Sequence, residues 1–550
     1  MYTLEIRGNG VFNKSVALKK EKTVNEIIEL YKISKDNIIA YKKNCDYVSS
    51  NEIFKEDGKL DFIFSTSREG FRILQETTLF VMMKAWNNLF PDKSKLVVEH
   101  SIGDGIYCEV FEDNKLKYKE VQALKNEMKK IINEALPIEK IKVNKDKAQE
   151  IFQNTDRDDI LKNLTLHNLE IYKCGNYHDY YLRQLSENTS YVHDFELIFL
   201  APGLIVRFPR RKYGKIQDDF RLSKKLFEAH QEHDKWLSIL DIHNVSSLNR
   251  ATDKFKISPL IQIEEALHEK KIVDIAEHIS RKKDVKVILI AGPTSSGKTT
   301  FAKRLSIQLR VIGITPKLIG MDDYFVSRAR TPIKENGEFD FECLEAIDLK
   351  LLNQHLIKLL NGEEVELPKY NFLTGISENS FSRISIKENE IIILEGIHGL
   401  NDKLTSSVPF NQKVKIYVSA LNNLNLDSHN RIPTTDSRKI RRILRDTKYR
   451  GHSAEKTLNM WDSVRDGEDV NIFPFQENAD YLFNSILTYE IAVLKKYVLP
   501  LLEKISCHSN QFSEAQRLIK LFRQISGIND SLVPSNSILR EFIGGSVFSY

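Results

Sequence analysis

The chain has 550 residues, enough for about three domains with separate hydrophobic cores. Its 41% hydrophobic and 29% charged residues are those of an ordinary soluble protein. The formal net charge of +5, from 81 basic and 76 acidic residues, gives no overall case for nucleic acid binding.

Five scattered cysteines, without a CxxC pair, argue against a disulfide framework or a cysteine-rich zinc site: Cys45, Cys108, Cys174, Cys343 and Cys507. The first residues, Met1–Arg7, alternate between apolar and polar types, unlike a signal peptide. No apolar run approaches the length needed to span a membrane. We therefore expect a cytoplasmic protein without a membrane partner.

Residues 1–65 are predicted to form a small β-rich domain. Alternating apolar residues suggest a hairpin around Gly8–Gly10. Thr23 and Glu26 have the spacing of a helix capping box, and strand patterns return at Asn37–Tyr41 and Leu60–Phe64. A hairpin, a helix and returning strands make a β-grasp arrangement, and this stretch resembles the TGS domain.

Residues 66–210 carry a helical run at Leu79–Leu89, the turn Phe90–Asp92, a charged helix at Tyr118–Ala135 and the motif Gly175-Asn-Tyr-His-Asp179. This order resembles the second additional, editing-type α+β domain of threonyl-tRNA synthetases. In that family a helical HxxxH and a later CxxxH bind a metal.

The matching metal positions here are Glu76, Phe80, Tyr181 and Leu185. Only Glu76 is of a type that commonly binds metal, so we expect the fold without the editing chemistry. The histidines His100, His167, His178 and His193 are dispersed, which favours structural or solvated roles.

Residues 211–285 are expected to form a helical connecting segment. A local basic cluster precedes and enters it: Arg207, Arg210, Arg211, Lys212 and Lys215. Such a run is usually a solvated linker, and RNA contact through the N-terminal half is the alternative.

The stretch Val287–Thr300 carries the clearest chemical signal in the chain. An apolar strand leads into a loop bounded by Gly292 and Gly297, and a helix opens at Lys298, as in the phosphate-binding pattern G-x-x-x-x-G-K-[ST]. Lys298 would neutralise terminal phosphates and the Thr299 hydroxyl would bind Mg²⁺. The pattern predicts nucleoside triphosphate binding by nine residues: Gly292, Pro293, Thr294, Ser295, Ser296, Gly297, Lys298, Thr299 and Thr300.

Two later strands each end in acidic residues. Thr315–Phe325 is predicted as a strand that reaches Asp322 and Asp323, and Ile391–Ile397 contains Glu395. Since the carboxyl ends of parallel strands share one edge of a sheet, these carboxylates should lie beside the phosphate loop. An α/β phosphotransferase layout follows.

Several motifs then make a family resemblance specific: Met321-Asp-Asp-Tyr-Phe325, Pro368-Lys-Tyr-Asn-Phe372, Leu394-Glu-Gly-Ile397 and Arg441-Arg-Ile-Leu-Arg-Asp446 with Arg450-Gly451. They resemble the uridine kinase/phosphoribulokinase family, with residues 286–550 as a P-loop kinase domain that has a helical C-terminal part. The whole chain resembles bacterial nucleoside kinases that join a TGS and synthetase-like front to a uridine-kinase-like back. The expected fold class is multidomain α/β and α+β.

The resemblance implies roles for individual residues. Asp322 matches the aspartate that accepts the proton of the nucleoside 5′-hydroxyl, and Glu395 matches the acid that supports Mg²⁺ or that base. The substrate site implied by the family also contains Tyr324, Phe325, Glu342 and Tyr370. Asp323 has no separate assignment, with a metal and a structural role equally open.

Arg442, Arg445 and Arg450 match the arginines of a helical lid that would stabilise the transferring charge. The alternative is a solvated basic helix face. The sequence also departs from uridine kinases: Gly375 stands in place of a base-reading His, Asn371 of an Asp, His452 of a lid arginine and Phe325 of a Tyr. The loop Asn422–Asp436 is longer, and base specificity stays open.

These features predict a kinase that uses ATP and Mg²⁺ to phosphorylate a nucleoside, with uridine or cytidine as the leading guess. A phosphoribulokinase-like enzyme for another hydroxyl substrate and an RNA-associated protein that senses ATP are the alternatives. The family resemblance also leads us to expect a homo-oligomer.

Overall fold

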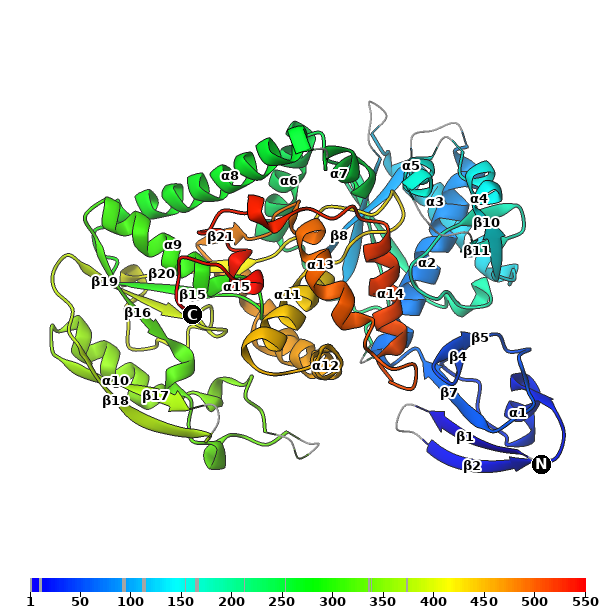
Figure 1. The fold of residues 1–550 in the computed structure, drawn as a ribbon, viewed down its shortest axis with the longest axis horizontal. Helices are drawn as coiled ribbons and strands as arrows, with labels where there is room; N and C mark the ends of the chain where they lie inside the picture. Colours follow the sequence, from blue (N-terminus) through cyan, green and yellow to red (C-terminus); the bar gives the residue numbers. More distant parts are fainter. Residues whose placement is uncertain are drawn as a thin grey trace.

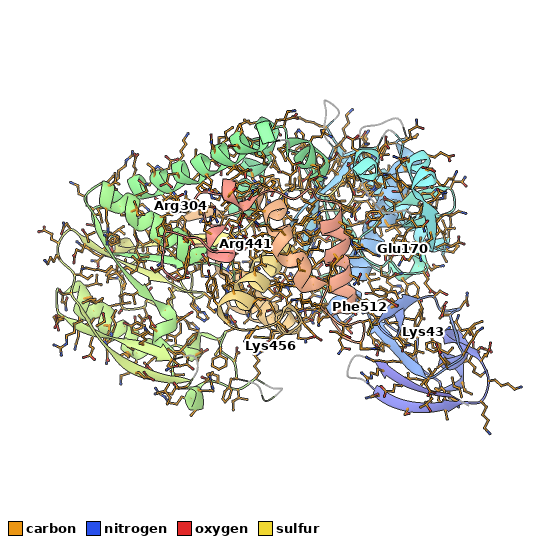
Figure 2. The ribbon with its side chains drawn as sticks, viewed as in Figure 1. Lys43, Glu170, Arg304, Arg441, Lys456 and Phe512 are labelled. Atoms are coloured by element: carbon orange, nitrogen blue, oxygen red, sulfur yellow. The ribbon has the colours of Figure 1, made fainter. Side chains whose placement is uncertain are left out.

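The computed structural model describes residues 2–8, 12–91, 95–110, 115–153, 155–163, 168–211, 213–252, 254–334, 337, 339–371 and 374–550. Five sequence predictions fall partly or wholly outside these ranges: the turns Gly8–Gly10 and Phe90–Asp92, and the residues His167, Lys212 and Phe372. In Figure 1 the kinase sheet lies on the left, the N-terminal half on the right and helices α11–α14 between them. Figure 2 adds the side chains that fill the space between these ribbons.

The N-terminal unit is a five-stranded sheet with one helix. Its elements are β1 (Tyr2–Gly8), β2 (Phe12–Leu18), β3 (Lys22–Thr23), α1 (Val24–Leu30), β4 (Ile38–Lys43), β5 (Asp46–Val48), β6 (Ile53–Phe54) and β7 (Gly58–Phe64). The sheet order is β2-β1-β7-β4-β5, with β1 and β7 parallel. The predicted capping box is confirmed, because the Glu26 N–H donates to Thr23 Oγ1 at 3.2 Å and the Thr23 N–H donates to Glu26 Oε2 at 2.7 Å. The resemblance to the TGS domain stays a prediction.

The second unit packs two long helices on an antiparallel sheet of order β13-β14-β9-β8. Its elements are α2 (Arg68–Leu89), β8 (Leu96–Ile102), β9 (Gly105–Val110), α3 (Tyr118–Asn133), β10 (Glu139–Asn144), α4 (Lys145–Ile151), α5 (Asp156–Asn163), β11 (Asn168–Cys174), β12 (Tyr177–Asp179), β13 (Glu196–Leu200) and β14 (Gly203–Arg207). Helix α2 begins eleven residues before the predicted Leu79, because Ser67 caps it by accepting from the Gly70 N–H. At the positions matched to an editing metal site, Phe80, Tyr181 and Leu185 form a small apolar cluster. The synthetase resemblance stays a prediction.

Three helices connect this unit to the phosphate loop: α6 (Lys224–Ile239), α7 (Val245–Ala251) and α8 (Lys254–Ser280). Arginines of the basic cluster that precedes them pair with carboxylates inside the chain. Arg207 contacts Asp104 at 3.0 Å, and Arg211 contacts Asp466 at 2.9 Å.

The C-terminal half is built on a parallel sheet of order β16-β19-β15-β20-β21. Its elements are β15 (Val287–Ala291), α9 (Lys298–Val311), β16 (Thr315–Gly320), α10 (Leu349–Leu360), β17 (Val365–Asn371), β18 (Ile376–Ile384), β19 (Glu390–Glu395), β20 (Lys413–Ser419), α11 (Thr434–Tyr449), α12 (Ala454–Asn471), β21 (Tyr481–Asn484), α13 (Glu490–Leu502), α14 (Phe512–Arg523) and α15 (Arg540–Ile543). Strand β15 is wholly buried at the centre, as expected for an apolar strand with neighbours on both sides. The predicted parallel α/β layout is confirmed.

The long loop before α11 joins the two halves of the chain. We call five of its contact residues the domain joint: Asp156, Arg157, Asp179, Asp427 and His429. His429 Nδ1 lies 2.7 Å from Asp179 Oδ2, and Arg157 pairs with Asp427. The Ser428 hydroxyl donates to Asp156 Oδ2 at 2.7 Å. This loop, noticed in the sequence only for its length, therefore anchors the N-terminal half to the kinase sheet.

Candidate active site

The phosphate loop, residues 292–297, connects β15 to α9 with the backbone shape that its glycines allow. A Cβ at Gly292 would lie 2.0 Å from the Val418 carbonyl oxygen, so only glycine fits there. Gly297 has φ +83° in the left-handed region, and a Cβ on it would meet Ile538 at 2.6 Å. The hydroxyls of Ser295 and Ser296 are buried without a hydrogen-bond partner among the described residues. Together these features form a cradle suited to an anion.

Lys298 and Thr299 open α9 opposite the end of β19. Lys298 Nζ donates to the Pro293 carbonyl at 3.3 Å and lies 3.9 Å from Glu395 Oε1. The Thr299 hydroxyl donates to Glu395 Oε2 at 3.3 Å. A hydroxyl and a carboxylate are oxygen ligands of the kind that Mg²⁺ accepts. Because Mg²⁺ usually keeps water and substrate phosphates as its other ligands, these two residues fit it without a larger protein cage.

Burial raises the pKa of Glu395 to about 7, with Asp322 and Glu541 adding to the rise and Lys298 opposing it. The proton on this carboxyl would have to leave before it could hold a metal ion. Positive charge near the phosphate loop would therefore favour the loss of this proton from Glu395.

Asp322 lies in a short 3-10 turn, Met321–Tyr324, at the carboxyl end of β16. The residue is partly open to solvent, but desolvation by the surrounding protein raises the pKa of its carboxyl, against the opposing charges of Lys298, Arg450 and Arg445. The sequence predicted Asp322 at a strand end beside the phosphate loop, and the structure places it there. The carboxylate of the neighbouring Asp323 instead accepts a hydrogen bond from the backbone of Tyr370.

The three predicted arginines gather around one buried acid at the end of α11. Asp446 lies 3.2 Å from Arg442, 3.2 Å from Arg445 and 3.5 Å from Arg450. Arg442 and Arg445 each donate to the Thr294 hydroxyl at 3.3 Å. Two of the three therefore touch the phosphate loop in this structure, with α11 packed against α12, α13 and α15. No lid movement is needed to bring them there.

Two buried ion pairs that the sequence did not point to hold the phosphate loop. Glu468 of α12 accepts from the Thr294 N–H at 3.1 Å and pairs with Arg438, whose Nε donates to the Thr294 carbonyl at 3.0 Å. Arg441 donates to Glu490 at 2.9 Å and reaches the Ser295 carbonyl at 3.5 Å. Arg441 directly precedes Arg442 in the sequence, and this position in the arginine motif is the signal that could have identified it. Glu468 carries no local motif.

The predicted substrate residues divide into two groups. Glu342 faces the arginines, and burial together with Glu468 raises its pKa against the charge of Arg442. Phe325 and Tyr370 pack edge to face, with ring centroids 5.5 Å apart. Tyr324 instead lies in the core with 1% exposure, and its hydroxyl is 3.0 Å from His355 Nδ1. In this structure Tyr324 therefore supports the Asp322 turn, and its contact with substrate stays a prediction.

Gly375, which was matched to the base-reading histidine of uridine kinases, has a backbone conformation that favours glycine. Its φ is +73°, and a Cβ there would lie 2.8 Å from Arg328 Nε. A larger residue would require both a strained backbone and a displaced arginine. Glycine is therefore the favoured residue at the turn of the hairpin β17–β18. The sequence did not predict this hairpin.

The end of the chain covers the start of α9. The Thr300 hydroxyl donates to Glu541 Oε2 at 2.6 Å and lies 2.9 Å from the Tyr550 hydroxyl. Thr300, expected to bind nucleotide, is therefore engaged by the C-terminal segment in this structure.

A phosphate cradle at a parallel-sheet edge, a Lys, two facing carboxylates and clustered arginines define the site of a P-loop phosphotransferase. Residues 287–492 match the Phosphoribulokinase / Uridine kinase family. A protein named "Uridine kinase" from Staphylococcus aureus is 32% identical over 197 residues, which cover 36% of this chain and 86% of that protein. A "Uridine kinase" from Halobacterium salinarum is 28% identical over 195 residues, covering 35% of this chain and 77% of that protein.

This chain belongs to the phosphoribulokinase/uridine kinase family, through a kinase domain that spans residues 287–492. A solved structure, "Structure of a Possible Uridine Kinase from Bacillus stearothermophilus", matches 39% of this chain and 98% of its own at 20% identity. Its TM-score is 0.27. No helix in the described part of the chain is long and apolar enough to cross a membrane.

Proposed function

We propose that this protein is a kinase that uses ATP and Mg²⁺ to phosphorylate the 5′-hydroxyl of a nucleoside, with uridine or cytidine as the preferred acceptor. The observation that carries the proposal is the position of Asp322. The residue is partly open to solvent at the end of β16, within the electrostatic reach of Lys298, Arg445 and Arg450. A carboxylate placed there can accept a hydroxyl proton beside a phosphate chain.

The other residues would divide the work of positioning and neutralisation. When bound, Mg²⁺ supplies charge neutralisation for the phosphates, and Thr299 and Glu395 would hold it. Residues 292–299 would bind the phosphates of ATP, whereas the Thr300 hydroxyl is held by Glu541. Arg442 and Arg445, already at the Thr294 hydroxyl, would face the charge that develops during transfer. Arg450 is more exposed and would act at the rim.

The acceptor would lie on the side of Glu342, Phe325 and Tyr370. A carboxylate next to Arg442 suits a ribose hydroxyl, and the Phe325–Tyr370 pair, which is buried in the core, would support this side of the site. Gly375 keeps a second acceptor class open, because the position that reads the base in uridine kinases has no side chain here. A sugar phosphate therefore belongs in the same assay.

The test is phosphate transfer from ATP with Mg²⁺ to each common nucleoside and to ribulose 5-phosphate. We expect one pyrimidine nucleoside to be phosphorylated, and Asp322→Asn to lower kcat by about 10²–10⁴-fold. Asp284→Asn, an exposed carboxylate in the turn before β15, is the matched control and should keep full activity. Transfer to ribulose 5-phosphate alone would reject the nucleoside assignment. Full activity of Asp322→Asn would reject the role of Asp322.

A further inference from the structure

A second cationic site lies away from the phosphate loop, where the two halves of the chain meet. A cavity of about 170 Å³ opens between α2, α11, α12 and α14. Five cationic side chains line it: Arg68, Arg72, Arg183, Lys439 and Arg517. At roughly 30 Å³ per water molecule, the space would hold about five or six waters. None of these side chains has a place in the proposed kinase reaction.

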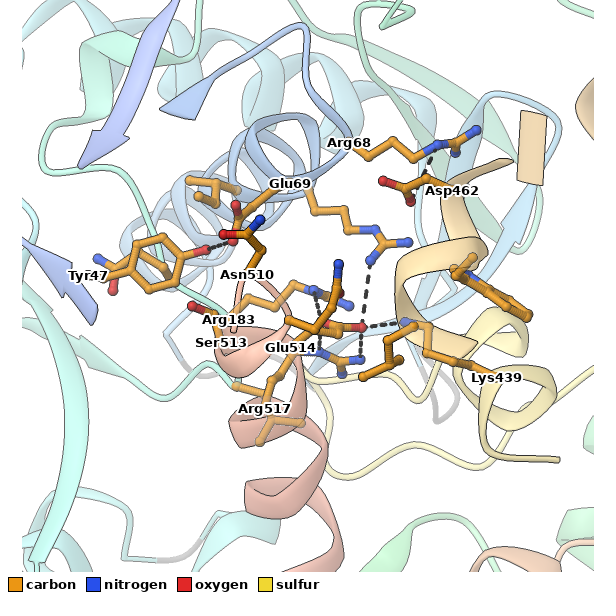
Figure 3. Close-up of a pocket in the computed structure, with 17 residues that line it drawn as sticks. Tyr47, Arg68, Glu69, Arg183, Lys439, Asp462, Asn510, Ser513, Glu514 and Arg517 are labelled. Carbon is orange, nitrogen blue, oxygen red and sulfur yellow. Dashed lines mark hydrogen bonds and ion pairs between the residues drawn. The ribbon is translucent and has the colours of Figure 1, made fainter. Parts of the chain in front are cut away.

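One carboxylate stands at the centre of the cluster. Glu514 of α14 lies 3.2 Å from Arg183, 2.9 Å from Arg517 and 3.7 Å from Arg72, and it also pairs with Lys439. Figure 3 shows Arg183, Arg517 and Lys439 converging on Glu514 from different elements. A single carboxylate therefore faces four cations.

Two more carboxylates lie behind this centre and do not balance it. Asp436 is 2.8 Å from Arg517 and 3.5 Å from Lys439, and Glu76 is 3.8 Å from Arg183. Arg431 adds a fifth positive charge, which acts on both of these acids. Arg68, Glu69 and Asp462 line the cavity as well. The described cluster thus holds six cations (Arg68, Arg72, Arg183, Arg431, Lys439 and Arg517) against five carboxylates (Glu69, Glu76, Asp436, Asp462 and Glu514). Buried charge without a partner is costly, so the surplus favours a bound anion.

Arg72 carries the surplus most directly. Burial lowers its pKa to about 10, and the neighbouring charge of Arg183 adds to this fall while Glu514 opposes it. The charged form of Arg72 is therefore less favourable than it would be in water, even with its ion pair to Glu514 at 3.7 Å.

Trp461 provides an independent sign of a missing ligand. It lines the cavity from α12 with 2% of its surface exposed, and its indole N–H has no hydrogen-bond partner among the described residues. A buried N–H donor of this kind normally finds an acceptor. An anion in the cavity would supply acceptor oxygens.

We propose that this cavity binds a short chain of phosphate groups, held by Arg72, Arg183, Lys439 and the Trp461 N–H. Guanidinium groups match phosphate oxygens in pairs, and several of them here point to one small space from separate elements. Inorganic pyrophosphate and the phosphate tail of a nucleoside diphosphate share this chemistry. Since Arg72 and Arg183 belong to the N-terminal half and Lys439 to α11, the ligand would connect the two halves.

The experiment measures pyrophosphate and ADP binding by calorimetry in a Lys298→Met chain, in which the phosphate loop is weakened. We expect binding that falls about tenfold or more when Arg72→Gln is added. Arg523→Gln, an exposed arginine on α14, is the matched control and should leave binding unchanged. Without pyrophosphate, Arg72→Gln should unfold at the same temperature or higher, because it removes a surplus buried charge.

Trp461→Phe gives a second measurement that keeps an aromatic ring in place. It should also weaken binding, because it removes the N–H donor and shortens the ring that lies next to Lys439. Tighter binding of pyrophosphate than of ADP would identify an inorganic ligand, and the reverse order would identify a nucleotide. Failure of the Lys298→Met chain to bind either compound would overturn the proposal. So would binding that neither Arg72→Gln nor Trp461→Phe weakens. Neither result depends on kinase activity.

Discussion

The domain joint and the candidate active site are both rich in buried charge, yet their charges are arranged in opposite ways. In the joint, burial opposes the ionisation of Asp179, but His429 and Arg157 outweigh it and lower the pKa of this carboxyl. Burial likewise works against the charge of Arg157, and Asp427 with Asp179 raises its pKa. Partners therefore favour the charged forms of Asp179 and Arg157, whereas at Asp427 burial outweighs the charge of Arg157 and raises the pKa.

At the active site, the surroundings favour the neutral forms. Burial raises the pKa of Glu395 and of Glu342, and in each case a neighbouring carboxylate adds to the rise. Burial and then Arg445 lower the pKa of Arg450, against the effect of Asp446. Such shifts are typical of groups that wait for a ligand. Pairs of opposite charge therefore hold the domain joint together. At the active site, burial and neighbouring like charges destabilise the charged forms, at the place where phosphate and metal would bind.

The largest effect on stability is expected in the joint. Asp427→Ala would remove the ion-pair partner of buried Arg157 and leave it only the weaker effects of Asp179 and Asp156. Breaking a buried pair typically costs about 3–5 kcal/mol of the free energy of unfolding. Urea unfolding monitored by tryptophan fluorescence measures it. Asp284→Ala, an exposed carboxylate before β15, is the control and should change little. A loss below about 1 kcal/mol would show that the joint does not depend on this pair.

A substitution in the arginine cluster of the active site should lower activity strongly and leave the free energy of unfolding nearly unchanged. Arg445→Gln takes away one of two donors at the Thr294 hydroxyl, and we expect kcat/KM to fall about 10²–10³-fold. The midpoint of urea unfolding should stay close to that of the parent chain, because Arg442 still pairs with Asp446. Arg310→Gln, exposed on α9, serves as the control. An unchanged kcat/KM would contradict a catalytic role of Arg445 and favour the alternative from the sequence, in which these arginines form a solvated basic helix face.

The pKa of Glu395 predicts a smaller, pH-dependent effect. Below pH 7 this carboxyl is mostly protonated, and protons would compete with Mg²⁺ for its oxygens. The apparent affinity for Mg²⁺ should therefore rise about tenfold per pH unit up to about pH 7 and then level off. Titrations of activity against Mg²⁺ between pH 5.5 and 8.5 measure this. Glu395→Gln should remove the pH dependence, and a flat profile in the parent chain would contradict the assignment.

The sequence predicted the kinase half well because its signals are local. The strand, the two glycines and Lys298 lie within fourteen residues, and Asp322 and Glu395 each follow an apolar strand. The parallel order of those strands then brings the carboxylates to the phosphate loop. The capping box at Thr23 is equally local.

The remaining features depend on pairs that are distant in the chain. Glu468 reaches Thr294 across 174 positions, and Glu541 reaches Thr300 across 241. Asp427 and Arg157 have no pattern that links them before the fold is known. A single sequence shows which residues carry charge, but only packing decides which of them find partners.

His429 offers the finest test of the comparison. Burial opposes its charge, but Asp179 at 2.7 Å raises its pKa above the ordinary value. The stabilisation from this raised pKa is fully present below about pH 6.5 and is lost as pH rises through the pKa of the folded state. His429→Asn should flatten this part of the pH profile of unfolding and cost on the order of 1 kcal/mol at pH 6. His243→Asn, an exposed histidine, should leave the profile intact. If His429→Asn lowers the free energy of unfolding equally at pH 6 and pH 9, the histidine stabilises the joint only through packing and neutral hydrogen bonding, and its charge contributes nothing.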